Sequence, residues 1–264
     1  MNFDLSMPPG LAAPLPTGFT RKAVETLGRR IANDEFSPNE AMPTEEELAE
    51  SLGVSRATVR DAIKVLSGKS LVRTARRYGT RVLPVSEWNL LDGDVVRWHT
   101  PDHPRLGRIF SETTELRSIM EPAAAALAAE RATEAQVQMI QSAAYTMHPE
   151  QDDIQALFDA DCRFHVTLLD ATQNQVMRQM RQIILTMLRV SYEFGVKDPE
   201  NDPVTREGHI AVAKAIAARN PKAARRAMAE MLERNRTLAL TRGDASRSSV
   251  PVLETRPRLA ILEG

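Results

Sequence analysis

The chain has 264 residues with 34 Lys or Arg and 35 Asp or Glu, a formal net charge of -1 that excludes a uniformly basic coat for nucleic acid. Its single cysteine, Cys162, excludes a disulfide framework and a cysteine-based zinc module, and no apolar run approaches the roughly 20 residues of a membrane span. Aromatic residues make up only 5%, while Ala, Leu, Met, Arg and Glu are abundant, so we expect a mainly α, cytoplasmic protein with no membrane partner.

Residues 1–16 contain four prolines and no hydrophobic periodicity, and we interpret them as a flexible N-terminal arm. A first domain is predicted at residues 17–84. Val24, Leu27 and Ile31 recur there at helical spacing and indicate its first helix.

Two capping signals mark two further helices in this domain. Thr44 stands three residues before Glu47, which is the pattern of a capping box at the start of a helix. Gly53 is expected to end this short helix. Ser55 can cap the next helix, whose buried apolar stripe begins at Val59. The two short helices therefore follow each other closely.

Two short extended pieces at residues 71–74 and 80–83 come next, and three helices before a small hairpin predict a winged helix-turn-helix. Between residues 55 and 81, eight Lys or Arg face one acidic residue, whereas residues 40–50 hold five Glu and no Lys or Arg. Such segregation of charge indicates a local surface for phosphate, and an ordinary solvated helix face is the alternative.

The side chains suited to reading DNA lie opposite the apolar stripe of the third helix, where basic residues follow one another at i, i+4 and i+8. Arg suits a bidentate contact with guanine, Ser and Thr bind phosphate or base edges, and a glycine in the wing lets the backbone approach the duplex. The predicted DNA-binding residues are Ser55, Arg56, Thr58, Arg60 and Lys64 of the helix and Arg77, Gly79 and Arg81 of the wing.

A second domain is predicted at residues 104–241, after a linker at residues 85–103 and before a C-terminal tail at residues 242–264. Polar breaks divide it into about six helices, which we expect to pack as an antiparallel bundle. The sequence thus predicts a mainly α fold in which a winged helix-turn-helix precedes an all-α effector domain.

Four ionisable side chains of the second domain sit on otherwise apolar helix stripes. Asp161 and His165 lie one turn apart on one predicted helix, while Arg117 and His209 belong to two others. Burying such groups is costly unless they meet one another, a ligand or a metal. One histidine of this kind would more simply be a satisfied core residue, but the four together favour an effector-binding pocket.

One set of motifs resembles the DNA-binding domain of GntR-superfamily transcription regulators: residues 42–49 (MPTEEELA), 54–62 (VSRATVRDA), 71–72 (LV) and 78–80 (YGT). A second set resembles the FCD effector domain of the fatty-acid regulator branch: residues 115–122 (ELRSIMEP), 128–133 (AAERAT), 161–165 (DCRFH) and 207–210 (EGHI). Together the two resemblances cover residues 17–240.

The resemblance implies a homodimer on a palindromic operator. It also implies that the residues touching DNA are Ser55, Arg56, Thr58, Arg60 and Gly79. Members of this branch often carry Arg, in contact with DNA, where this chain has Glu46. A carboxylate cannot make that contact, so the operator sequence of the branch does not carry over to this chain.

The resemblance also implies a metal site. Many FCD domains hold zinc or a similar divalent ion through residues matching Asp161, His165 and His209 and through a further histidine on the last helix. This chain has Met231 at that last position, and a thioether is a poor ligand for such an ion. Three protein ligands plus water or an effector carboxylate can still suffice. The alternative is a metal-free site in which the imidazoles and Arg117 bind the effector directly.

The predicted function is that of a one-component transcriptional repressor, in which a small carboxylate in the helical domain alters the affinity for operator DNA. Residues 88–98 resemble the linker of regulators of sugar-acid catabolism such as galactonate utilisation, so a sugar acid is the expected effector. Two alternatives are a metallohydrolase that uses Asp161, His165 and His209, and an architectural DNA-binding protein. The former lacks an evident general base, and the latter would need no pocket.

Overall fold

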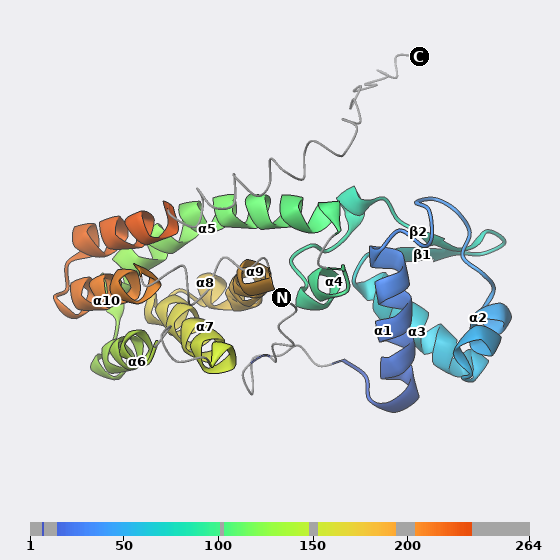
Figure 1. Cartoon of the computed structure of the whole chain (residues 1–264), viewed down its shortest axis with the longest axis horizontal. Helices are drawn as coiled ribbons and strands as arrows, with labels where there is room; N and C mark the ends of the chain where they lie inside the picture. The colour runs from blue at the N-terminus through green and yellow to red at the C-terminus, as the bar shows by residue number, and fades with distance from the viewer. Residues whose placement is uncertain (1–6, 8–14, 101–102, 148–152, 194–203, 234–264) are drawn as a thin grey trace, which may run out of the picture.

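The structure is a computed structural model that describes residues 7, 15–100, 103–147, 153–193 and 204–233. These residues form two helical parts, and the long helix α5 (Pro104–Arg131) runs from one part to the other (Figure 1). The predicted tail and most of the predicted arm lie outside the described residues. Within the described ranges, no helix combines the length and the apolar character needed to cross a membrane.

The N-terminal part is the winged helix-turn-helix that the sequence predicts. Its elements are α1 (Gly18–Ala32), α2 (Glu45–Leu52), α3 (Arg56–Gly68), β1 (Val72–Ala75) and β2 (Gly79–Val82). The two strands are antiparallel, with Val72 opposite Val82 and Ala75 opposite Gly79. The inward faces of the three helices and the hairpin share one apolar core, so the exposed face of α3 is held at a fixed angle to the wing.

Local capping explains why α2 and α3 begin where they do. The Thr44 side chain accepts the backbone N–H of Glu47, and the Glu47 carboxylate accepts the backbone N–H of Thr44 at 2.7 Å. The Ser55 hydroxyl accepts the backbone N–H of Thr58 at 3.1 Å. Gly53 lies between the two helices with φ 63°, where a side chain would be strained. The predicted capping box and the second cap are therefore both present.

The segment at residues 85–103, expected to be a linker, folds against the winged part. It contains the 3-10 helix η1 (Val85–Glu87) and the short helix α4 (Gly93–Arg97), and the side chain of Trp98 after α4 is fully buried. The indole lies against the backbone of Gly28 in the middle of α1. The contact between Trp98 and Gly28 thus holds the segment against α1. Neither residue predicts this contact from the sequence alone.

Ion pairs reinforce this attachment. Lys69, at the end of α3, contacts Asp92 at 2.7 Å and Asp94 at 2.9 Å, and Arg97 contacts Glu25 of α1 at 2.6 Å. Burial lowers the pKa of Lys69, but the two aspartates outweigh burial and hold it above its usual value. The connection is therefore tied to α1 and to α3 through charges that remain paired.

We expect Gly28→Ala to destabilise the winged part by about 1–3 kcal/mol, the usual cost of overpacking. A Cβ at this position would lie 2.4–2.6 Å from three carbons of the Trp98 indole, so the indole or α1 must move. Urea unfolding followed by tryptophan fluorescence measures the change. Gly68→Ala is the matched control, since its added Cβ would meet nothing within 4 Å. Equal stability of the two variants would contradict the packing.

The helix α5 starts on the winged part and continues into the second part. Arg105 in its first turn donates to the carbonyl oxygen of Ala32 at 2.8 Å and to the carboxylate of Asp34 at 2.7 Å. Its 28 residues span about 42 Å. One continuous element therefore connects the end of α1 to the interior of the second part.

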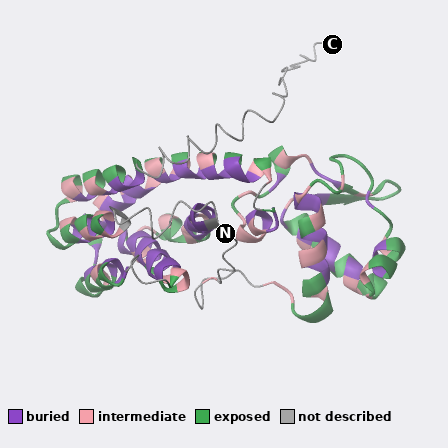
Figure 2. Cartoon of the chain, in the orientation of Figure 1, coloured by how far each residue is buried: buried purple, intermediate pink, exposed green. Residues whose placement is uncertain are grey.

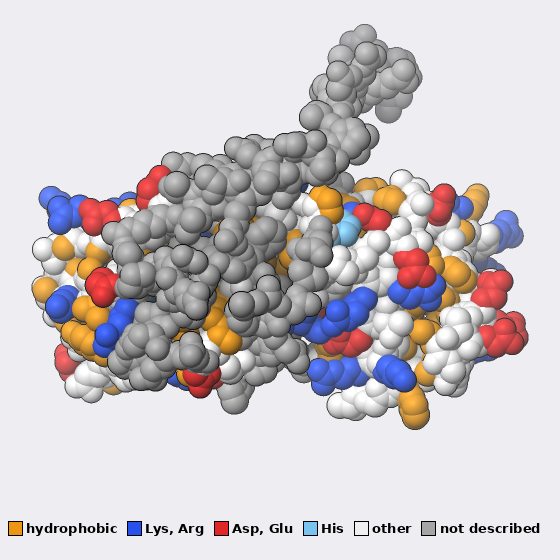
Figure 3. All heavy atoms as spheres, viewed as in Figure 1, with side chains coloured by type: hydrophobic (Ala, Val, Ile, Leu, Met, Phe, Trp, Pro, Cys, Tyr) orange, Lys and Arg blue, Asp and Glu red, His pale blue; other side chains and the backbone are white. Residues whose placement is uncertain are grey.

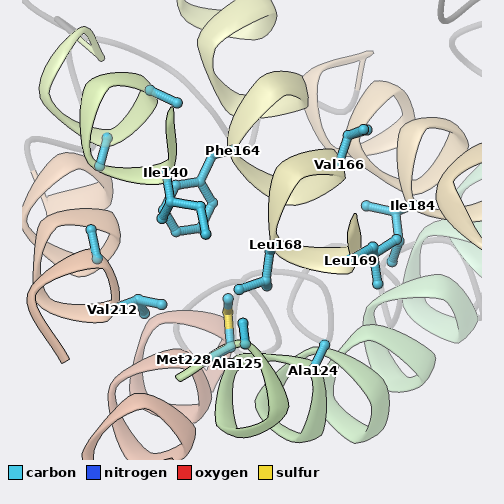
Figure 4. Close-up of a cluster of buried hydrophobic side chains, with 14 of the residues drawn as sticks. Ala124, Ala125, Ile140, Phe164, Val166, Leu168, Leu169, Ile184, Val212 and Met228 are labelled. Atoms are coloured by element: carbon cyan, nitrogen blue, oxygen red, sulfur yellow. The ribbon is translucent and has the colours of Figure 1, made fainter. Parts of the chain in front are cut away.

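The second part is the helical domain predicted from the sequence. Around α5 lie α6 (Glu134–Tyr145), α7 (Ile154–Ala171), α8 (Gln175–Gln179), α9 (Arg181–Glu193), α10 (Val204–Ala217) and a further helical stretch at residues 221–233. Buried residues line the inner faces of these helices (Figure 2). In Figure 4, Phe164 of α7 lies beside Ile140 of α6 and faces Val212 of α10. The predicted mainly α, two-part architecture is confirmed.

Candidate functional site

The face of α3 that points away from the core carries the predicted basic row. Arg56, Arg60 and Lys64 are exposed, whereas Val59 and Ile63 are buried. Figure 3 shows Lys and Arg side chains on the winged part with acidic side chains close to several of them. This exposed row supports the major-groove surface inferred from the sequence.

Ser55 and Thr58 lie at the N-terminus of α3, as expected. Their hydroxyl oxygens are 2.8 Å apart, Ser55 is exposed and Thr58 is half-buried. Residues at the start of a recognition helix are the ones nearest to base edges or phosphates. Both side chains therefore combine a role in starting the helix with a position suited to DNA contact.

Two arginines of the basic row are paired with carboxylates of α2. Arg60 donates to both carboxylate oxygens of Glu45, at 2.7 Å for the closest contact, and Arg56 lies 3.7 Å from Glu46. Exposed pairs of this kind contribute only about 0–1 kcal/mol, so both arginines can exchange them for DNA. Two residues of the acidic run thus lie next to the basic row because α2 packs on α3.

The wing places its predicted residues at two positions. Arg77 and Gly79 lie at the tip, both exposed and both with positive φ, of 73° and 71°. Arg81 lies further along β2, where its guanidinium donates to the carbonyl oxygen of Asn39. Tyr78 between the tip residues is 68% exposed, and the sequence reasoning did not single it out. Its aromatic ring extends the surface that the tip can present to DNA.

In the helical domain, three potential metal ligands meet in the interior. Asp161 and His165 project from α7 and His209 from α10, each at most 1% exposed. Asp161 Oδ1 lies 3.2 Å from His165 Nε2 and 3.0 Å from His209 Nε2, and the two Nε2 atoms are 3.4 Å apart. The i, i+4 spacing noted in the sequence thus converges with a histidine from another helix.

Two buried side chains of α5 complete the cluster. Arg117 Nε donates to Glu121 Oε1 at 2.5 Å, and Arg117 Nη2 is 3.4 Å from His165 Nε2. Glu121 Oε2 lies 2.7 Å from His165 Nδ1. We call the five residues the polar centre: Arg117, Glu121, Asp161, His165 and His209. The structure therefore brings together the four side chains predicted to bind effector and adds a carboxylate.

Sequence reasoning missed Glu121 and Tyr192 as members of this environment. Glu121 lies one helical turn after Arg117 and within the motif at residues 115–122, but neither signal gave it a role in the site. The buried Tyr192 of α9 feels the charge of Asp161, and nothing in its local sequence marks it as polar and buried. Both residues depend on how α5 and α9 pack against α7.

Charges within the polar centre oppose the effect of burial on pKa. Burial raises the pKa of Glu121, but Arg117 and His165 outweigh it and bring the pKa to about 2. Burial lowers the pKa of His165, but the carboxylates of Glu121 and Asp161 leave it above its usual value. Burial and the charge of Asp161 raise the pKa of Tyr192. The Glu121 carboxylate is therefore ionised at neutral pH.

The donor set of the polar centre fits a divalent ion. Two ligands bonded to zinc at about 2.1 Å lie about 3.0 Å apart at a right angle and about 3.4 Å apart at a tetrahedral angle. The three separations among the donor atoms of Asp161, His165 and His209 fall in that range, from 3.0 to 3.4 Å. Imidazole and carboxylate are also donors that zinc and related ions accept.

Met231 lies in the helical stretch at residues 221–233. It is buried, and its Cγ would be 2.7 Å from a Cβ on Gly208, the residue before His209. The side chain therefore packs against the start of α10 as an apolar group. Among the residues that the structure describes, Asp161, His165 and His209 are the potential ligands that lie close enough together to hold one ion.

Two family models match the chain in the order of its two parts. Residues 19–82 match the family described as "Bacterial regulatory proteins, gntR family", and residues 112–234 match the FCD domain. The first range covers the winged helix-turn-helix, and the second covers most of α5 and the helices around it. The polar centre therefore lies wholly within the FCD match.

Similar proteins of known name are transcription regulators. The galactonate operon transcriptional repressor of Escherichia coli K12 is 34% identical over 214 residues, which cover 81% of this chain and 93% of that protein. The transcriptional repressor NanR of Citrobacter rodentium is 29% identical over 207 residues, covering 77% and 78% of the two chains. Both similarities extend across the winged part and the FCD domain.

A solved structure supports the fold. The regulator Lar, described as controlling the expression of the Listeria monocytogenes agr system, superposes with a TM-score of 0.62 at 21% identity and covers 86% of this chain and 99% of its own. The metallohydrolase alternative is wrong, because both family matches and the named relatives are those of regulators. The chain belongs to the GntR family of bacterial transcriptional regulators and is of the type that carries an FCD domain.

Proposed function

We propose that the protein is a metabolite-responsive repressor that binds a palindromic operator as a homodimer in the cytoplasm and releases it when a small sugar acid occupies the polar centre. The observation that carries the proposal is a buried centre of paired charges in the same chain as an exposed basic recognition helix. The proposal divides the chain into a DNA-binding domain at 17–84, a linker at 85–103 and an effector domain at 104–241.

The recognition surface supports the DNA part of the proposal. The exposed row on α3 and the exposed wing tip belong to one small domain that is built on a single apolar core. A single winged domain contacts few base pairs, and two-fold pairing supplies a second half-site at a fixed spacing. A homodimer on a palindrome is therefore the arrangement that gives this surface enough specificity.

The polar centre supports an acidic, hydroxylated effector. Arg117 presents a planar guanidinium that suits a carboxylate, and its Nη2 faces His165. Asp161, His165 and His209 can bind the hydroxyl groups of a sugar acid or hold a divalent ion. Such an ion, when bound, supplies positive charge and open positions for carboxylate and hydroxyl oxygens. The name of the galactonate operon relative favours an aldonate among small carboxylates.

Two helices connect the polar centre with the winged part. The helix α5 carries Arg117 at one point and Arg105, bonded to the end of α1, about 18 Å away along its axis. In α9, Tyr192 interacts electrostatically with Asp161, and Thr186 donates to the carbonyl oxygen of Leu91 in the linker at 3.3 Å. A ligand that binds two placements of these helices unequally shifts the operator affinity.

The proposed function is tested by selecting operator DNA from random sequence and titrating its complex with D-galactonate and other aldonates. We expect a two-fold symmetric site and release of DNA by at least one sugar acid, together with a rise in melting temperature. The architectural alternative would instead show no response of DNA binding or melting temperature to any small carboxylate.

A chelator is expected to lower both the melting temperature and the effector response if the polar centre holds a metal. His209→Ala should reproduce the effect of chelation, since it removes one of the three converging donors. Differential scanning fluorimetry with and without EDTA measures this. His103→Gln, which removes an imidazole near Asp34 at the start of α5, is the control. A chelator without effect would favour direct, metal-free binding of the effector.

A further inference from the structure

Glu121 is a buried charge. The proposed function gives Arg117, Asp161, His165 and His209 a part in binding the effector or an ion, but it gives Glu121 none. The Glu121 side chain is 1% exposed and divides its two oxygens between different partners. One oxygen accepts from Arg117 Nε at 2.5 Å, and the other lies 2.7 Å from Nδ1 of His165. A carboxylate that served only to neutralise Arg117 would be expected to face the guanidinium with both oxygens.

The contact with His165 determines which ring nitrogen can act as a ligand. An ionised carboxylate is an acceptor only, and each ring nitrogen of His165 has one beside it: Glu121 Oε2 lies 2.7 Å from Nδ1 and Asp161 Oδ1 lies 3.2 Å from Nε2. When the imidazole is neutral, we expect its one N–H on Nδ1, at the shorter contact. A neutral imidazole has one N–H, and its other nitrogen then keeps a free lone pair. That other nitrogen is Nε2, which faces Asp161 Oδ1 at 3.2 Å and His209 Nε2 at 3.4 Å and has Arg117 Nη2 at 3.4 Å.

We propose that Glu121 is a positioning residue of the polar centre: it holds the proton of His165 on Nδ1, aims the Nε2 lone pair at the space between Asp161 and His209, and so raises the affinity of this centre for a divalent ion. Arg117 fixes the carboxylate in turn by its bond to the other oxygen. Partners of this kind typically change metal affinity about 10- to 100-fold. The inference rests on the metal-holding role within the proposed function.

Glu121→Gln is the sharpest test, because the amide has the same shape but replaces one acceptor by a donor. Arg117 Nε–H can only donate, so the amide oxygen is expected to face Arg117 and the amide NH₂ to face His165. An NH₂ group needs an acceptor, so His165 must move its proton to Nε2, where it blocks metal binding. We expect zinc affinity, measured by calorimetry on the full chain, to fall about 10- to 100-fold.

Glu115→Gln is the matched control, since Glu115 lies exposed on the same helix and loses the same charge. Its zinc affinity should equal that of the wild type. Glu121→Asp keeps the charge and the acceptor, so it should recover part of the affinity that Glu121→Gln loses. A purely structural role for Glu121 would change the melting temperature without this order among the variants.

A second readout does not depend on the stability of any variant. In the zinc-loaded wild type, long-range ¹H–¹⁵N spectra should show His165 protonated on Nδ1 and ligating through Nε2, and a reversed assignment would overturn the inference. Wild-type affinity in a folded Glu121→Gln variant would overturn it as well and leave the proposed function intact. A wild-type protein that binds no zinc would instead overturn the metal-holding role and this inference together.

Discussion

Arg56→Ala and Arg60→Ala are each expected to weaken binding to the selected operator by about 1–3 kcal/mol, which corresponds to about 5- to 150-fold. Their side chains are 60% and 56% exposed and contribute nothing to the core, so the loss reflects contacts to DNA and not unfolding. Gel-shift titration at fixed salt measures the affinities, and circular dichroism verifies the fold. Arg108→Ala removes an exposed arginine of α5 that is not among the predicted DNA-binding residues, and it should bind as the wild type does.

The pairing with α2 adds a finer expectation for Arg60. Removing the arginine leaves the carboxylate of Glu45 unpaired beside the phosphates, so Arg60→Ala should lose more affinity than the missing base contact alone. Glu45→Gln combined with Arg60→Ala should recover part of that loss, and Glu50→Gln combined with it should not. Unchanged affinity of both arginine variants would remove α3 from its role as recognition helix.

Arg117→Met is expected to lower the free energy of unfolding of the helical domain by about 3–5 kcal/mol and to abolish release of operator by the sugar acid. The variant strands the buried Glu121 carboxylate without its cation, and breaking a buried pair from one side is costly. Urea unfolding measures the first effect, and gel shifts with the effector measure the second. Specific operator binding should persist, because the recognition surface lies in the other domain.

Arg117→Lys separates charge from geometry at this position. It retains a cation for Glu121 but lacks the planar fork that a carboxylate effector would use, so stability should recover more than the response to effector. If Arg117→Ala and His209→Ala both responded to the effector at wild-type concentrations, the polar centre would not be the effector site.

The winged part was predictable from sequence because its signals are local. The capping box at Thr44, the cap at Ser55 and the apolar spacing in each helix act within a few residues, and the structure contains all of them. The pairing of Glu45 with Arg60 was not predictable in the same way. It depends on the angle at which α2 packs on α3, which no spacing within either helix specifies.

In the polar centre too, the features that depend on local spacing were predictable and those that depend on helix packing were not. The i, i+4 spacing of Asp161 and His165 on an apolar stripe, taken together with Arg117 and His209, was enough to predict a buried polar site. Glu121 did not stand out, because a Glu four residues after an Arg is typical of an exposed helical ion pair. Only the packing of α5 against α7 turns that pair inward and places the carboxylate beside an imidazole.

The attachment of Trp98 to Gly28 and of Arg105 to Asp34 has a consequence for building chimeric sensors. A foreign DNA-binding domain joined at residue 84 would place its own first helix against this chain's Trp98 and Arg105. Any side chain at the position of Gly28 would then collide with the indole, and the foreign domain would have no defined orientation on the helical domain. The module that can be exchanged therefore ends within the first turn of α5, about twenty residues later than the hairpin suggests.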